Sequence, residues 1–229
     1  MSGRWQVDAV LLDMDGTLID TERIYISSLT TVLTGFGFAD AATVCHAMVG
    51  LAGPDCQKLL LDRYGADFPL GAVNKAFVAR RDEIFRDGLP LKAGARELLD
   101  ALRDSNCPMA LVTSASRRTA EQHLTLAGIR TRFDTLLTRD DVERGKPDPA
   151  LYLLAAKTIR TPPQHCVAVE DSSVGVAAAH GAGVITLMVP DLEQPGTETR
   201  QRCAAVLPDL HAVLATLRLR GGLGTAVSL

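Results

Sequence analysis

The sequence predicts an α/β fold in which a doubly wound parallel sheet forms the core and a block of helices is inserted after the first strand. Over most of the chain, short apolar runs alternate with amphipathic stretches of helix length, which is typical of a parallel sheet covered by helices. Between residues 20 and 90 this alternation stops, because helical periodicity recurs there without an intervening strand. The first pattern predicts the sheet, and the second predicts the helical insert.

The predicted elements follow one another in a regular order. Five apolar runs bounded by polar or glycine-containing turns predict buried strands, at residues 9–12, 109–113, 135–138, 166–169 and 184–189. Amphipathic stretches predict helices between and after these strands, at residues 93–104, 116–127, 149–158, 172–180 and 209–217. Three more helical stretches make up the insert, at residues 22–33, 54–64 and 71–86.

These elements divide the 229-residue chain into three parts. Residues 1–19 and 90–220 form the sheet core, residues 20–89 form a helical cap domain, and residues 221–229 form a flexible, glycine-containing tail. The insert follows the first strand at the carboxyl end of the sheet, where open α/β sheets bind ligands. We therefore expect it to act as a lid.

Composition excludes several classes of protein. A net charge of −3 and a pI near 5.9 provide no basic surface for nucleic acid or an anionic membrane. No apolar run reaches the roughly 18 residues that span a bilayer, and acidic Asp8 and Asp13 stand where a signal peptide would be apolar. Five cysteines without a CxxC pair give no zinc or redox motif. We expect a cytoplasmic monomer without nucleic-acid or membrane partners.

The run DMDGT, residues 13–17, directly follows the first predicted strand. Asp13 and Asp15 are two positions apart on an extended segment, so their carboxylates point the same way and can share one small site. One can attack phosphorus while the other protonates the leaving oxygen, and buried anions of this kind require a hard divalent cation, for which Mg²⁺ fits best. The alternative is a turn in which an aspartate caps the next helix.

Two polar signals follow later strands. Thr113 and Ser114 end the second predicted strand just before a helix, where a hydroxyl and free backbone N–H groups can bind an anion. Simple capping of that helix by Ser114 or Ser116 is the alternative. Lys146 lies in the stiff run GKPDP and is suited to neutralise a phosphate, although a lone lysine is usually a surface charge.

Glu170 and Asp171 directly follow the buried run CVAV. Two acids at the end of a buried strand are costly unless they are paired or bind a metal. They can also belong to a helix N-terminus, with Asp171 or Ser172 as the cap. Because a second acidic motif ends the first strand, we favour a metal site.

These motifs together resemble the haloacid dehalogenase-like hydrolase superfamily, in particular the phosphatases and phosphomutases that carry a helical cap after the first strand of a Rossmann-like core. The resemblance spans residues 10–210. It implies that Asp13 is the nucleophile, Asp15 the general acid and base, and Lys146 the cation that balances charge. It also implies that Thr113 and Ser114 bind phosphate.

The resemblance further implies Mg²⁺ held by Asp13, the backbone carbonyl of Asp15, and Asp171, with Glu170 supporting it directly or through water. An aspartate two residues after the nucleophile is absent from the dehalogenase members, so Asp15 indicates phosphate chemistry. We expect a Mg²⁺-dependent phosphatase that hydrolyses a small phosphorylated metabolite, such as a sugar phosphate, through an aspartyl-phosphate intermediate. The alternatives are a β-phosphoglucomutase-like sugar-phosphate mutase and a non-catalytic phosphate-binding module.

The cap sequence favours hydrolysis over the mutase. A mutase must hold a second phosphate, which calls for cationic cap side chains. The mutases that resemble this chain carry Lys and Arg near residues 49–53, where this chain has VGLAG, and a His where it has Tyr25. Lys58 and Arg63 lie further along the same predicted helix and can still supply a cation.

Overall fold

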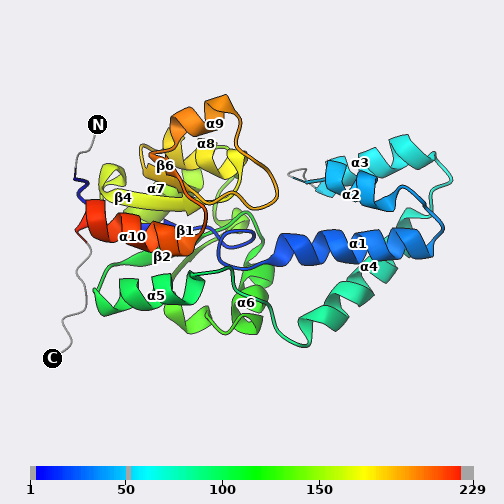
Figure 1. The fold of residues 1–229 in the computed structure, drawn as a ribbon, viewed down its shortest axis with the longest axis horizontal. Helices are drawn as coiled ribbons and strands as arrows, with labels where there is room; N and C mark the ends of the chain where they lie inside the picture. Colours follow the sequence, from blue (N-terminus) through cyan, green and yellow to red (C-terminus); the bar gives the residue numbers. More distant parts are fainter. Residues whose placement is uncertain (1–3, 50–52, 223–229) are drawn as a thin grey trace. The chain divides into compact units, whose positions relative to one another are not determined.

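The protein divides into two compact units, which are described separately. The structure, a computed structural model, describes residues 4–49 and 53–222. One unit consists of Met1–Asp20 with Pro90–Leu229, and the other of Thr21–Leu89. Figure 1 shows a sheet flanked by helices in the first unit and helices alone in the second. The predicted α/β fold class is confirmed.

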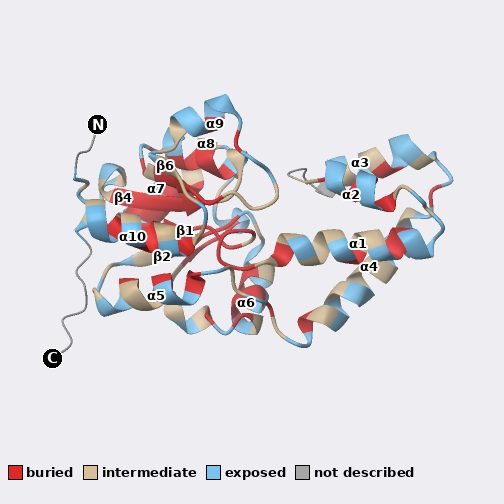
Figure 2. Ribbon diagram, in the orientation of Figure 1, coloured by how far each residue is buried: buried red, intermediate tan, exposed pale blue. Residues whose placement is uncertain are grey.

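Six strands of the described chain form one parallel sheet. They are β1 (Ala9–Leu12), β2 (Met109–Val112), β3 (Thr135–Leu137), β4 (Cys166–Glu170), β5 (Ile185–Met188) and β6 (Ala205–Val206). Their order is β3-β2-β1-β4-β5-β6, so the chain winds outward from β1 to β3 and then adds β4 to β6 on the other side. The central strands are buried on both faces (Figure 2), which explains their continuous apolar sequences.

Helices cover the sheet and alternate with its strands. They are α5 (Ala95–Asp104), α6 (Arg117–Leu126), α7 (Ala150–Thr158), α8 (Ser173–Gly181), α9 (Thr197–Arg202) and α10 (Leu210–Gly221). Alternate strand residues, among them Leu11, Val112 and Ala168, share one core cluster with Tyr152 of α7 and Ala179 of α8. This two-residue period is that of a strand whose side chains point to opposite faces.

The C-terminal helix α10 is longer than the sequence predicts. The helix predicted for residues 209–217 extends to Gly221, so Gly221 belongs to a helix and not to a flexible tail. The N-terminal segment supports this extra turn, because the Trp5 N–H donates to the Arg220 carbonyl over 2.8 Å and the Arg220 guanidinium lies 5.2 Å from the Trp5 ring centre. Residues 223–229 of the predicted tail lie outside the described residues.

The helical unit contains α1 (Thr21–Gly35), α2 (Ala41–Ala47), α3 (Gly53–Tyr64) and α4 (Leu70–Phe85). The helix α2 was not predicted. The unit has its own apolar cluster, which includes Leu33, Val44, Leu60 and Val73, one residue from each helix. Each of its helices therefore contributes to a common core, as the separate periodicity of the insert indicates.

The two connections to the helical unit run side by side. The backbone N–H of Asp20 donates to the Pro90 carbonyl over 3.0 Å, and that of Lys92 donates to the Leu18 carbonyl over 2.9 Å. Ile19 and Leu91 pair in antiparallel fashion between them. The Lys92 ammonium lies 2.5 Å from the buried Asp191 carboxylate, which fastens the second connection to the sheet unit.

In the part of the chain that the structure describes, no helix combines the length and the apolar character that crossing a membrane requires.

Candidate active site

The candidate site lies where the winding of the sheet changes direction. β1 and β4 pair in register from Ala9 with Cys166 to Leu12 with Val169. Asp13, which follows β1, and Glu170, the last residue of β4, therefore lie next to each other at the same edge of the sheet. The Asp13 N–H donates to the Val169 carbonyl over 3.1 Å, which holds Asp13 at this position. Ligands of open α/β sheets bind at such a switch point, outside the carboxyl ends of the strands.

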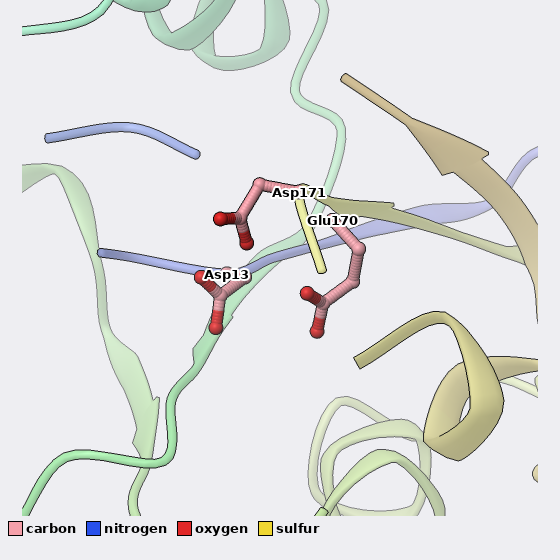
Figure 3. A group of neighbouring side chains, drawn as sticks. All are labelled: Asp13, Glu170 and Asp171. Carbon is pink, nitrogen blue, oxygen red and sulfur yellow. The ribbon is translucent and has the colours of Figure 1, made fainter. Parts of the chain in front are cut away.

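Three carboxylates converge there. Figure 3 shows Asp13, Glu170 and Asp171 with their carboxyl groups facing a common space. One oxygen from each lies within 4.8 Å of the others, a spacing that a single metal ion can bridge. The structure thus brings together the acids of two sequence motifs that are far apart in the chain.

Lys146 is buried among these acids, and its side chain is only 3% exposed. Its ammonium lies 2.6 Å from Asp13 Oδ1 and 2.6 Å from Glu170 Oε1, and it donates to the Val112 carbonyl over 2.9 Å. A lysine in these surroundings is a fixed point charge and not a solvated surface group. The alternative of a surface charge is therefore excluded.

Glu170 is fully buried and receives a second donor, the hydroxyl of Tyr152 on α7. Its other oxygen, Oε2, is buried and has no hydrogen-bond partner among the described residues. A Cβ at Gly175 would lie 2.0 Å from Oε2, so glycine is required beside this side chain. The sequence analysis missed Tyr152, because nothing in the sequence shows that an apolar helix turns a phenol toward the site.

Asp171 is not the N-cap of α8, a role that the sequence left open between Asp171 and Ser172. Ser172 caps α8 by accepting from the Gly175 N–H over 3.1 Å. The Thr17 hydroxyl donates to Asp171 Oδ1 over 3.4 Å. Gly16, whose φ is +81°, passes so close that a Cβ there would lie 2.2 Å from Asp171 Oδ2. The DMDGT turn therefore approaches Asp171 directly and uses its glycine to do so.

The hydroxyl residues after β2 have different environments. Thr113 is buried, and its hydroxyl accepts from the Ala115 N–H over 3.0 Å. Ser114 is exposed. Ser116 caps α6 by accepting from the Thr119 N–H over 3.3 Å, so the helix does not need Ser114 as its cap. That Thr113 and Ser114 bind phosphate stays a prediction.

Asp15 contacts His123, a residue that was not among the predicted site residues. The Nδ1 nitrogen of His123, on α6, lies 3.0 Å from Asp15 Oδ1. His123 is 2% exposed and shares the buried side of α6 with Ala120 and Leu124. The sequence does show a histidine at helical spacing among apolar residues, and this pattern could have identified His123. A buried histidine in that setting is more often a core residue with a satisfied hydrogen bond.

The electrostatics of the site favour an additional cation. Burial raises the pKa of Asp13 to about 8, against the lowering effect of Lys146 and with a further increase from Glu170. Burial alone would lower the pKa of Lys146, but the carboxylates of Asp13 and Glu170 raise it above its usual value. Burial and the Glu170 carboxylate raise the pKa of Tyr152, which stays a neutral donor. The Lys146 ammonium contacts two of the three acids, Asp13 and Glu170, and Asp171 offers an oxygen within 4.8 Å of theirs.

The helical unit contains an open cavity of about 420 Å³ that is lined by its own residues. Its wall is mostly apolar, and Tyr25 lies in it, with ring centres 6.1 Å from Phe77 and 6.3 Å from Phe85. Among the described wall residues, Glu22 and Arg81 are the charged ones. A cavity of this size is in the range of small-molecule sites.

The two cap cations that the sequence singled out are engaged elsewhere. Lys58 pairs with Asp62, and Arg63 lies 2.5 Å from Asp40. A hydrogen bond from Tyr64, and to a smaller extent one from Arg63, holds the pKa of Asp40 below its usual value. The cation on the cavity wall is instead Arg81, which the sequence analysis did not consider. Residues 50–52 of the VGLAG loop lie outside the described residues.

The fold and site define an α/β protein with a cluster of three carboxylates at the carboxyl edge of its parallel sheet. The model of the haloacid dehalogenase-like hydrolases matches residues 10–189, and the chain belongs to this family. The phosphorylated carbohydrates phosphatase of Thermotoga maritima is 30% identical over 178 residues, which cover 78% of this chain and 82% of that protein.

Two solved structures extend the likeness. A family hydrolase from Deinococcus radiodurans, crystallised with phosphate and sodium, has a TM-score of 0.81 and 28% identity, covering 96% of this chain and 98% of its own. A Thermotoga maritima structure provisionally assigned as a β-phosphoglucomutase has a TM-score of 0.79 and 27% identity, covering 93% and 99%. The expectation of a phosphoric monoester hydrolase in the phosphatase and β-phosphoglucomutase-like branch is confirmed.

Proposed function

We propose that the protein is a Mg²⁺-dependent phosphatase that hydrolyses a small phosphorylated metabolite through an aspartyl-phosphate intermediate on Asp13. The observation that carries this proposal is the contact of Asp13 with Lys146 at the carboxyl edge of β1, 2.6 Å apart, with Asp15 two residues further on. A nucleophile, a fixed cation and a second acid are the groups that phosphoryl transfer requires.

Each of these groups has one task in the proposed reaction. The Asp13 carboxylate attacks phosphorus in line with the leaving oxygen, and the phosphorus–oxygen bond to the leaving group breaks. Asp15 gives its proton to that oxygen. In the second half, Asp15 takes a proton from a water molecule, which attacks phosphorus and releases inorganic phosphate and Asp13. Lys146 neutralises charge on the phosphoryl oxygens throughout.

The residues present fit a divalent cation. Glu170 Oε2 is buried without a hydrogen-bond partner among the described residues, and Asp13, Glu170 and Asp171 offer the oxygen ligands that Mg²⁺ prefers. When bound, Mg²⁺ would offset the negative charge that develops on the phosphoryl group. In the absence of such a cation, burial favours the protonated form of Asp13, with its pKa near 8. The Deinococcus relative, which holds phosphate and sodium, supports the pairing of anion and cation.

We infer a sugar phosphate or a similar phosphomonoester as substrate. The Thermotoga relative, a phosphatase of phosphorylated carbohydrates, supports this class. The second candidate is a sugar-phosphate mutase, and the observation that favours it is Arg81 on the cavity wall of the helical unit. A mutase needs a cation in this unit for the phosphate that is not reacting.

A screen of phosphorylated metabolites for release of inorganic phosphate, with Mg²⁺ and with EDTA, tests the proposal. We expect release in Mg²⁺ and none above background in EDTA, with activity restored by excess Mg²⁺. Acid-stable but base- or hydroxylamine-labile labelling of the protein by ³²P substrate would identify the acyl phosphate. Phosphate release that EDTA leaves unchanged would contradict the Mg²⁺ requirement, and no release from any substrate would contradict the enzyme itself.

A further inference from the structure

His123 is a buried imidazole whose hydrogen bond leads directly to the site. Its neighbours on the buried side of α6, Ala120 and Leu124, are apolar. A polar ring in such surroundings costs free energy unless it has a hydrogen-bond partner. The structure provides that partner from a segment 108 residues away in the chain, the Asp15 carboxylate, with Nδ1 and Oδ1 3.0 Å apart.

The two side chains differ in accessibility, and this difference separates their roles. The Asp15 side chain is 23% exposed, so a substrate can reach it. The His123 side chain is 3% exposed and is shielded from a substrate. His123 can therefore influence the reaction through Asp15.

We propose that His123 is a positioning residue, whose Nδ1–H donates to Oδ1 of Asp15 and fixes the carboxyl group in the orientation that delivers a proton to the leaving oxygen. This inference rests on the phosphatase mechanism proposed above. A carboxyl group on a short, partly exposed side chain has several rotamers, and only some of them direct an oxygen toward the reacting bond. A buried partner on a packed helix selects one of them.

The reaction offers a readout that separates positioning from folding. 4-Nitrophenyl phosphate releases a stable anion that needs no proton, whereas an alkyl phosphate releases an alkoxide that does. The kcat/KM value covers the steps up to release of the leaving group, so it excludes the hydrolysis of the intermediate. The ratio of kcat/KM for the two substrates is also independent of the fraction of folded enzyme.

The experiment compares wild type with His123→Leu and His123→Asn, using the best alkyl phosphate from the substrate screen and 4-nitrophenyl phosphate. Leucine fills the space without a donor, and asparagine carries an amide nitrogen at about the same distance from the backbone as Nδ1. For His123→Leu we expect kcat/KM on the alkyl phosphate to fall at least about tenfold and that on the nitrophenyl ester by less than about twofold. For His123→Asn we expect most of the loss to be recovered.

Leu124→Ala is the matched control, because Leu124 is buried on the same side of α6 and has no polar group. We expect it to lower the melting temperature without changing the substrate ratio. If His123→Leu does not fold, His123→Gln, whose amide lies further from the backbone, replaces it.

Two outcomes overturn the inference while leaving the phosphatase intact: equal losses on both substrates for the His123 variants, or an asparagine variant as impaired as the leucine one. A wild-type protein that hydrolyses neither substrate class would overturn the proposed function, and the positioning role with it.

Discussion

Asp13 has two contacts that separate it from an ordinary turn aspartate: its backbone is tied to β4, and its carboxylate touches a buried lysine. Asp13→Asn preserves the shape of this side chain and removes its nucleophilic charge. We expect turnover to fall by several orders of magnitude while the far-ultraviolet circular dichroism is unchanged. A purified variant that keeps more than about a tenth of the wild-type rate, a loss below roughly 1.4 kcal/mol, would show that another group attacks phosphorus.

The raised pKa of Asp13 also predicts how the metal-free protein responds to pH. Burial raises this pKa from 3.8 to about 8, so between these values the folded state binds more protons than the unfolded state. The free energy of unfolding of the metal-free protein should therefore fall as pH rises through this window, and this contribution should level off above it. Melting temperatures in EDTA from pH 5 to 9 measure the trend, and Asp13→Asn should weaken it.

Metal binding should counteract that trend. In the proposed site Mg²⁺ would compete with the proton for the Asp13 carboxylate, so the stabilisation by Mg²⁺ should grow with pH. An Mg²⁺-induced increase in melting temperature that is the same at pH 6 and pH 8.5 would contradict this coupling.

Asp171 and Lys146 should give different defects. Asp171→Ala removes a proposed metal ligand, so we expect the Mg²⁺ concentration for half-maximal activity to rise by about tenfold or more. Lys146→Ala removes the point charge between Asp13 and Glu170, so it should lower kcat with a smaller change in that midpoint. It should also destabilise the metal-free fold by about 3–5 kcal/mol, because two buried carboxylates lose their shared cation. An unchanged midpoint for Asp171→Ala would reject its role as a ligand.

At the scale of elements, the paired connections predict that the helical unit can be removed. No strand lies in the described residues of Thr21–Leu89, and the Asp20 nitrogen lies 3.0 Å from the Pro90 carbonyl oxygen, so a short glycine linker can join the cut ends. We expect a chain without residues 21–89 to unfold cooperatively and to lose discrimination among substrates. That the unit selects the leaving group stays a prediction until this measurement. A deletion protein without a thermal transition would show that the sheet depends on the insert.

The sequence predicted best those helices and strands whose hydrophobic patterns extend over enough residues to be recognised. The apolar runs at β1, β2 and β4 and the amphipathic α5 were located to within a few residues. By contrast, β6 has two residues, Ala205–Val206, too few to show alternation, and α9 reads TETRQR, which has no apolar side. The short α2, AATVCHA, was missed because its seven residues make only two turns, although Ala41, Val44 and Cys45 are buried on one side of it. Such elements form because neighbours pack against them, which a local pattern does not contain.

For the candidate site, the local motifs were readable and the partners from other elements were not. Asp13 and the pair Glu170 and Asp171 directly follow predicted strands, so the sheet brings them to one edge. Lys146 lies on the loop between the predicted strand at residues 135–138 and the next helix. Tyr152 and His123 reach that edge from helices, and their orientation depends on how α7 and α6 pack. No spacing along the chain encodes that packing.

At the scale of the whole molecule, we expect hydrolysis to exceed isomerisation. Lys58 and Arg63 pair with Asp62 and Asp40. Arg81, the cation on the described cavity wall, pairs with Asp82 over 2.7 Å, so a neighbouring carboxylate holds each of these three cations. The test incubates the enzyme with β-glucose 1-phosphate, Mg²⁺ and a trace of the bisphosphate, and follows phosphate and glucose 6-phosphate. Isomerisation much faster than phosphate release would reject the assignment, and Arg81→Ala would then be expected to abolish it.

The pairing of β1 with β4 also sets an order of events during synthesis. Asp13 is made before the strand that completes its surroundings, Cys166–Glu170, which follows more than 150 residues later in the sequence. The helical unit is continuous in sequence, so its contacts are local and can form first. The nascent chain therefore carries the proposed nucleophile unassembled until β4 has been made, and hydrolytic competence depends on the pairing of β1 with β4 at the centre of the sheet.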